Sequence, residues 1–443
     1  MATYLNGAYN KLAGLLAIKL AQNLPVLLNT EQQVSKEVFE SGRAANGFTM
    51  NYVLPDYGQV LEGPTIDESK MDYTAGIVPV TLRQFNIPFS AGNYTMVNGG
   101  NAPTYPQLME DPGKYGGTAE TRNLLQDFDK QVKFPYGANL ASKMQKLTIA
   151  AGFAGSGTKI VLDANAIGNG VTLWDAMSMA TSAIRNARAD DDVFGVVSPR
   201  LAAFAARGAA NLFHPGDRIS KLWTKCELGE FATAKWFETA DMGIFKMPAA
   251  GTGLAVGDTA PTIDPTFVMT EGATEIPLSA AIGAVIPKGT PFYIVDSNNE
   301  RIKQVDPIGY ETGVDFCFAL AEDTAATDTS LKIQPIYTKG GLKNVTKLID
   351  MTQDACTIEP VLQPDTSYAT GLVWAKPGLA TAWGQMDNLD GANNFTFNDK
   401  GLLFYGASMA DIVHRRNIWR LDTLKGETVT MTNWVASIFV EII

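Results

Sequence analysis

The sequence predicts an α+β fold in which a mixed central domain is split by an inserted all-β segment. All seven tryptophans lie within 171–247 or 372–434, and large aromatic side chains dominate core burial. The intervening stretch, 251–341, lacks tryptophan and has twelve acidic and five basic residues, a net charge of −7 out of the chain's −11. A chain of 443 residues accommodates about two to four domains.

The first segment, 1–46, is predicted to be an N-terminal helical arm. Its leucines share one face of a helix that Leu24-Pro25 ends. No run reaches the roughly 20 apolar residues that cross a bilayer, and the start lacks a secretory pattern. Three widely spaced cysteines fit a reducing compartment. We therefore expect a protein that is made and used without export and without a membrane.

The segment 47–99 is predicted to form an extended two-stranded ribbon. Strand-like runs at 48–54 and 77–89 flank a polar stretch, 56–76. The apolar alternation of the second run slips by one at Arg83-Gln84, which predicts a β-bulge.

Such a ribbon has no core of its own and is marginally stable in water. A loop of this length is unusual inside a compact domain unless it has a function. It is either a mobile surface hairpin or an arm that lies across a neighbouring subunit. The candidate inter-subunit contacts are three charged residues at the tip and one at the slip: Asp67, Glu68, Lys70 and Arg83.

The segment 100–170 is predicted to be a peripheral domain with a long helix. An amphipathic helix before residue 134 is interrupted by Phe134-Pro135, and a second begins near Leu140 and ends at Gly152. The stretch Gly152–Lys159 superficially resembles a phosphate-binding loop, but its lysine does not directly follow the last glycine. We interpret it as a linker.

The central domain is predicted to comprise 171–250 and 342–443. In the first part, a helix from Leu173 to Ile184 precedes an apolar strand, Val193–Val197, and Ser198-Pro199 begins another helix. The insert, 251–341, contains five β-prone runs between turns, which predict a small barrel or sandwich. These runs are Thr266–Thr270, Thr274–Ser279, Thr290–Asp296, Val314–Leu320 and Leu331–Ile336.

Motifs for catalysis, metal binding or cofactor binding were sought and not found. The two histidines, His214 and His414, lack metal-site spacing, and we interpret the cysteines as small buried residues. The stretch Asp296–Glu300 lacks the glycine and distal Glu of a calcium loop and is predicted to be a turn. The acidic balance argues against a protein that grips nucleic acid. We expect neither an enzyme nor a cofactor.

This order of parts resembles the Hong Kong 97-like capsid fold of tailed bacteriophages, which has an N-terminal arm, an extended loop, a spine helix and a central α/β domain. The inserted β-domain resembles the coat proteins of the short-tailed Salmonella phage type. The likeness is carried by Val171–Asp175, by Pro287–Thr290 with Phe292–Ile294, and by Arg420–Gly426. Pro135 departs from it, since a proline interrupts the expected spine helix.

The resemblance implies a major capsid protein whose hexamers and pentamers form an icosahedral shell around packaged double-stranded DNA. Its implied partners are a scaffolding protein, a portal and, in some phages, decoration proteins. Sequence-specific DNA binding is not implied. Two alternatives stay open: another self-assembling or carbohydrate-binding surface protein, which should carry a secretory signal, and a cytosolic acidic hydrolase, which leaves the ribbon without a purpose.

Overall fold

The computed structural model describes most of the chain from Leu24 to Ile442. The described ranges are 24–39, 48–53, 77–91, 134–168, 170–189, 191–204, 229–249, 251, 254–338, 344–399, 402–411 and 416–442. Three predictions lie outside them: the N-terminal helix before Leu24, the ribbon tip at 54–76, and the helix before Phe134. The described part of the predicted helical arm, 1–46, is the four-residue helix α2 (Pro25–Leu28) followed by strand β1 (Glu31–Phe39). The prediction of a helical arm is therefore wrong there, because β1 pairs with β17 in a sheet. His214, His414 and Cys226 also lie outside. No described helix is long and apolar enough to span a membrane.

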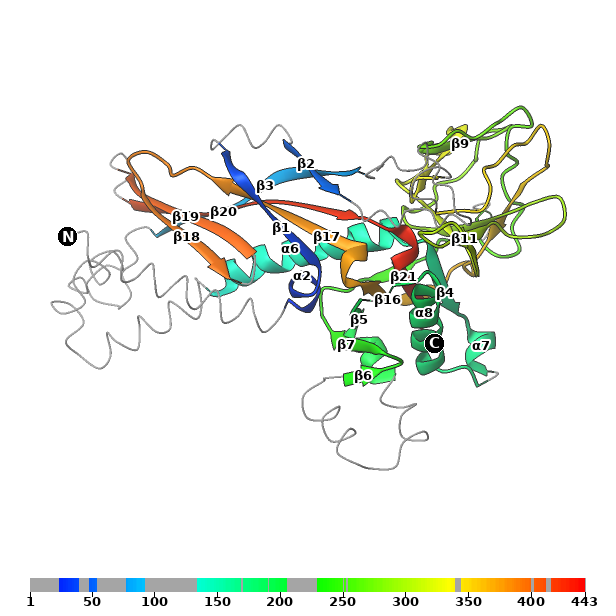
Figure 1. Cartoon of the computed structure of the whole chain (residues 1–443), viewed down its shortest axis with the longest axis horizontal. Helices are drawn as coiled ribbons and strands as arrows, with labels where there is room; N and C mark the ends of the chain where they lie inside the picture. Colours follow the sequence, from blue (N-terminus) through cyan, green and yellow to red (C-terminus); the bar gives the residue numbers. More distant parts are fainter. Residues whose placement is uncertain are drawn as a thin grey trace, which may run out of the picture.

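The first body of the molecule is a seven-stranded sheet, called the long sheet here, with strand order β1-β17-β20-β19-β18; β3 also pairs with β20, and β2 pairs with β3. Its strands are β1 (Glu31–Phe39), β2 (Phe48–Val53), β3 (Ile77–Ala91), β17 (Leu379–Met386), β18 (Asn393–Asp399), β19 (Leu402–Asp411) and β20 (Arg416–Val429). At about 3.3 Å per residue, β3 is roughly 50 Å long. These long strands give the molecule its extended side (Figure 1).

The helix α6 (Phe134–Gly155) runs along the long sheet (Figure 1). Leu140 and Met144 of α6 pack in one cluster with Trp383 and Leu421 of the sheet. Pro135 lies in the first turn of α6, where its missing N–H costs nothing. The proline thus stands where a helix begins.

The predicted end of this helix at Gly152 is wrong, because α6 continues to Gly155. A Cβ on Gly152 would lie 2.6 Å from Leu372 Cδ2, and one on Gly155 would lie 2.5 Å from Val429. Both glycines therefore allow close packing of the helix. The predicted linker at Gly152–Lys159 is wrong as well, since helix and strand occupy most of it.

The second body is the central sheet, with strand order β4-β21-β16-β5-β7-β6 and β8 beside β16. Its strands are β4 (Thr158–Leu162), β5 (Val193–Val197), β6 (Gly229–Phe231), β7 (Ala234–Glu238), β8 (Ile244–Lys246), β16 (Ser367–Ala375) and β21 (Val435–Glu441). Two helices, α7 (Ala164–Gly168) and α8 (Leu173–Asn186), follow β4. The predicted helix at Leu173 and strand at Val193 are confirmed. Thr172 and Asp175 form a capping box at the start of α8.

The prediction that the tryptophans mark the core of a single central domain is only partly right. Trp174, Trp236 and Trp434 share the core of the central domain, and Trp374 lies in an adjoining cluster. Trp383 instead packs against α6 in the long sheet. The chain therefore leaves the central domain for β17–β20 and returns with β21, so assigning all of 342–443 to the central domain is wrong.

The third body, called the insert, has its own core and two sheets. One sheet has the order β15-β10-β13-β14-β9, and the other pairs β11 with β12. Its strands are β9 (Glu275–Pro277), β10 (Pro291–Val295), β11 (Lys303–Val305), β12 (Glu311–Asp315), β13 (Phe318–Leu320), β14 (Ser330–Gln334) and β15 (Thr357–Pro360). Cys317 and Cys356 are buried here, as predicted.

Three predictions about the insert need correction. The run Thr266–Thr270 makes only an isolated bridge at Val268. The run Val314–Leu320 is divided between β12 and β13. The boundary at Gly341 is too early, because β15 belongs to the insert sheet and Ile358 to its core.

One side of the joint between the insert and the central domain is built around a buried lysine. The Lys159 ammonium, on β4, donates to the carbonyl oxygens of Ser156 (2.7 Å) and Cys317 (3.4 Å). The Cys317 N–H in turn donates to the carbonyl of Gly157 (2.9 Å). Burial lowers the pKa of Lys159.

Neutral side-chain hydrogen bonds complete this joint. Asn433 Nδ2 donates to the carbonyls of Val305 (2.6 Å) and Asn344 (3.1 Å). Gln304 Nε2 donates to Thr158 Oγ1 at 2.6 Å. Because these groups are buried, losing one would leave a partner unsatisfied at a cost of about 1–3 kcal/mol. The insert is therefore held firmly on the central domain.

Candidate functional site at the base of the ribbon

The base of the predicted two-stranded ribbon is present, and its second strand changes partner. Strand β3 pairs antiparallel with β2 from Ile77 to Leu82, and with β20 from Arg83 to Ala91. Both registers are uninterrupted, so the predicted β-bulge at Arg83-Gln84 is wrong. The slip in the apolar alternation marks the point where the strand exchanges one neighbour for another.

The base of the ribbon is anchored by a small core. Val80 and Leu82 of β3 are buried in one cluster with Ala382, Met386 and Leu424 of the long sheet. The ribbon base is therefore stabilised by a core that it shares with the long sheet.

A glycine lets the ribbon cross β20 closely. A Cβ on Gly426 would lie 2.6 Å from the carbonyl oxygen of Thr81 and 2.7 Å from Val80 Cγ1. Because any side chain there would collide with the ribbon's backbone, Gly426 fixes how near the ribbon lies to the sheet.

Three charged residues meet where the ribbon joins the sheet. Arg83 Nη2 lies 2.6 Å from Glu427 Oε1, and Lys425 Nζ lies 3.0 Å from Glu427 Oε2. The Lys425 and Glu427 side chains are 0% and 4% exposed, whereas that of Arg83 is 57% exposed. The Lys425 ammonium also donates to Thr148 Oγ1 (2.6 Å) and to the Met144 carbonyl (3.2 Å) of α6. We call Arg83, Glu427 and Lys425 the base triad.

Burial lowers the pKa of Lys425, and the nearby Glu427 carboxylate opposes that shift. The base triad thus extends from the surface of the ribbon to the buried face of α6. It connects three elements that are far apart in the sequence.

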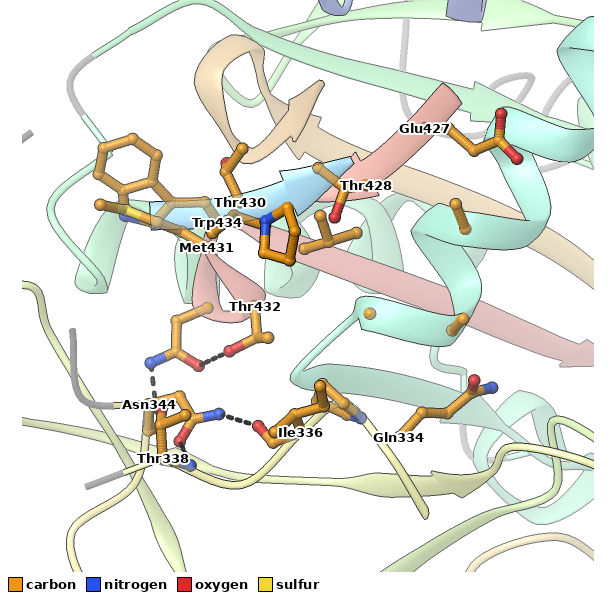
Figure 2. Close-up of a pocket in the computed structure, with 18 of the residues that line it drawn as sticks. Gln334, Ile336, Thr338, Asn344, Glu427, Thr428, Thr430, Met431, Thr432 and Trp434 are labelled. Atoms are coloured by element: carbon orange, nitrogen blue, oxygen red, sulfur yellow. Dashed lines mark hydrogen bonds between the residues drawn. The ribbon is translucent and has the colours of Figure 1, made fainter. Parts of the chain in front are cut away.

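A cleft of about 610 Å³ opens beside the base triad. Its lining is largely apolar, and Ile336 on its rim is 51% exposed. Figure 2 shows Gln334 and Ile336 of the insert on one side and Thr428 of β20 on the other. The ribbon base contributes Val78 and Pro79, which are not labelled there. The ribbon, the long helix, the central domain and the insert all border this cleft.

A second pocket, of about 920 Å³, lies on the insert and is polar. Arg301 donates to both carboxylate oxygens of Glu359 (2.6 and 2.7 Å) and to Asp315 (3.0 Å). Its guanidinium also lies 4.2 Å from the centroid of the Tyr293 ring, and Lys303 is ion-paired with Asp315. These contacts stabilise the insert surface. Among the described residues, no group of three His, Cys, Asp or Glu side chains is placed to hold a metal ion.

Of the four predicted contact residues, the structure describes Arg83. Asp67, Glu68 and Lys70 lie outside the described residues. Sequence reasoning missed Glu427 and Lys425. No local signal marks them, because every residue from Leu421 to Gly426 is buried and burial does not alternate along this part of β20. An interior lysine also runs against the usual exposure of charge.

Comparisons with known proteins give remote similarities only. No family model matches this chain, and no curated protein matches it. Among solved structures, it is similar to the capsid of the cyanophage P-SCSP1u, with 9% identity, TM-score 0.38, and coverage of 93% of this chain and 86% of that one.

Two further structures show likeness of the same degree. A structure of Mycobacterium phage Ogopogo has 11% identity, TM-score 0.37, and coverage of 95% and 92%. A virus-like particle from Pyrococcus furiosus has 9% identity, TM-score 0.36, and coverage of 97% and 98%. A TM-score below 0.5 is too low to establish a shared fold.

Proposed function

We propose that this chain is the major capsid protein of a tailed bacteriophage, a structural subunit of an icosahedral shell that encloses double-stranded DNA. The ribbon is the observation that carries the proposal. Val53 pairs with Ile77, so the chain leaves and re-enters the ribbon side by side. The 54–76 stretch between them is longer than the roughly 12–15 residues that loops in compact domains seldom exceed. A neighbouring subunit is the surface that such an arm would cover.

The elongated body supports the same function. Strands β3 and β20 have 15 and 14 residues, beyond the roughly 3–10 usual in globular proteins. Helix α6 has 22 residues, or about 33 Å at 1.5 Å per residue. A subunit of this shape exposes large sides to identical neighbours. The order of ribbon, long helix, central sheet and insert follows the resemblance to the Hong Kong 97-like fold.

The proposed partners are other copies of this chain in hexamers and pentamers, a scaffolding protein and a portal during assembly in the host cytoplasm, and decoration proteins on the finished virion. The net charge of −11 suits an inner wall that does not hold entering DNA. Tight binding of purified subunits to duplex DNA at physiological salt would contradict this role for the charge.

Negative-stain electron microscopy of the overexpressed chain, with and without a co-expressed scaffolding protein, tests the proposal. We expect closed shells, or tubes and sheets when scaffold is absent. A uniform monomer under both conditions would contradict it. The same monomer with glycoside- or ester-hydrolysing activity would favour the acidic hydrolase, and binding to a carbohydrate surface would favour a surface protein.

A further inference from the structure

The base triad has a charge arrangement that simple strand pairing disfavours. Arg83 of β3 and Lys425 of β20 are direct cross-strand partners, and like charges opposite one another destabilise a sheet. Glu427, two residues along β20 from Lys425, resolves the conflict by giving one carboxylate oxygen to each cation. The pairing of Arg83 opposite Lys425 is therefore compatible with the charges only while Glu427 bridges them.

The triad lies at the point where β3 changes partner. Leu82 is the last residue paired with β2, and Arg83 is the first paired with β20. A shift of β3 by one residue would move Arg83 away from Glu427 and exchange the buried and exposed faces of the strand. Gly426, between the two triad members of β20, admits the ribbon backbone at this place.

Lys425 connects the ribbon base to helix α6. Its three ammonium hydrogens have three acceptors, one on β20 and two on α6. Such a buried ion pair is weakly stabilising at best, because its desolvation offsets the attraction, and apolar replacements are often neutral or stabilising. Buried polar groups of this kind are in several systems associated with the selection of one register.

We propose that the base triad is a register lock that fixes where the ribbon leaves the long sheet and couples its direction to helix α6. In the assembled shell, which rests on the proposed function, this lock would give every copy the same arm geometry. Arg83, Glu427 and Lys425 are positioning residues in this proposal.

The test compares Lys425→Met with Lys159→Met. Both lysines are fully buried and donate to backbone carbonyls, but Lys159 lies at the insert joint. In Lys425→Met, Glu427 keeps Arg83 as its partner. Hydrogen exchange in the unassembled subunit is measured at the amides of 83–91 in β3 and 144–152 in α6. We expect both to exchange about ten-fold faster in Lys425→Met and within about two-fold of wild type in Lys159→Met.

Unchanged exchange in β3 of Lys425→Met would overturn the lock, as would an equal increase in Lys159→Met. If Lys425→Met is insoluble, Arg83→Met replaces it, since an exposed side chain is removable without unfolding the subunit. A smaller increase in β3, of up to about five-fold, is then expected, because the pair is exposed.

Shell diameters by electron microscopy form the second measurement. We expect mixed diameters for Lys425→Met and one diameter for Lys159→Met. Uniform Lys425→Met shells of wild-type size would count against the lock. If the exchange result holds while the wild-type chain forms no shells, the lock stands and the proposed capsid function fails.

Discussion

The molecule buries one lysine at each of two joints, and the joints are built differently. At the insert joint, Lys159 donates to carbonyl oxygens and is accompanied by neutral hydrogen bonds. At the ribbon base, Lys425 is ion-paired with Glu427, which also binds Arg83 at the surface. The first joint holds two cores together. The second specifies one alignment of β3, the strand that carries the ribbon base.

The largest predicted effect comes from breaking the buried ion pair. Glu427→Gln leaves the Lys425 ammonium without a carboxylate, and removing one partner of a buried pair costs about 3–5 kcal/mol. We expect the free energy of unfolding, measured with urea, to fall by that amount.

Adding Lys425→Met to Glu427→Gln should restore most of the lost free energy of unfolding, because the double variant no longer buries an unpaired ammonium. A double variant that stays as unstable as Glu427→Gln would show that the ion pair is not the cause.

A pair of glycine substitutions compares the packing of the two joints. Gly426→Ala would place a Cβ 2.6 Å from a backbone oxygen of the ribbon. Gly157→Ala would first meet the side chains of Asn433 (2.9 Å) and Phe316 (3.0 Å), with the nearest backbone oxygen, that of Thr432, at 3.1 Å. Overpacking costs about 1–3 kcal/mol, and backbone yields less than a side chain. We expect the loss in the free energy of unfolding, measured by thermal unfolding, to be near the top of that range for Gly426→Ala and near the bottom for Gly157→Ala. The reverse order would contradict the packing at the ribbon base.

The two lysines also predict a dependence on pH. Both have a folded-state pKa below the ordinary 10.5. Between that lowered pKa and 10.5, the unfolded state holds a proton that the folded state has lost, so stability rises with pH by at most about 1.4 kcal/mol per pH unit for each lysine.

In Lys159→Met, the part of the rise in stability that is due to Lys159 should be absent. The corresponding change in Lys425→Met should be smaller, because Glu427 opposes the pKa shift at Lys425. Urea unfolding of the three proteins between pH 8 and 10.5 measures it. Identical slopes would exclude a pKa shift at either lysine.

The smallest effect is expected at the exposed end of the base triad. Arg83→Gln removes an ion pair whose cation is 57% exposed, and exposed pairs contribute about 0–1 kcal/mol. We expect the melting temperature to change little, by no more than a few degrees. A much larger loss would mean that Arg83 contributes to the core of the ribbon base rather than to its alignment.

Local patterns in the sequence predicted the elements that depend on neighbouring residues. The ribbon strands, the helix at Leu173 and the strand at Val193 each follow from short-range periodicity and caps. The long sheet could not be predicted from local patterns, because its strands are far apart in the sequence. Strand β1 pairs with β17, and β3 pairs with β20, each roughly 330–350 residues later. Trp383 was therefore assigned to the wrong core.

The base triad could not be predicted from the sequence for a related reason. Glu427 and Lys425 are recognisable as partners of Arg83 only once β20 is known to lie beside β3. Composition places charged residues at the surface, and nothing near Lys425 in the sequence marks it as buried. Arg83 was selected because the apolar pattern slips there, which was the local trace of a long-range pairing.

Deletion of Tyr57–Gly76 tests the central claim, that this chain builds a shell with its arm, most directly. The described ribbon base, from Val78 to Leu82, keeps its core contacts in such a variant. With the scaffolding protein co-expressed, sedimentation velocity should show the full chain in particles of shell size and the deletion variant as a folded subunit with an unchanged melting temperature. Shells formed equally well without the arm, or a full-length chain that stays monomeric, would contradict the account.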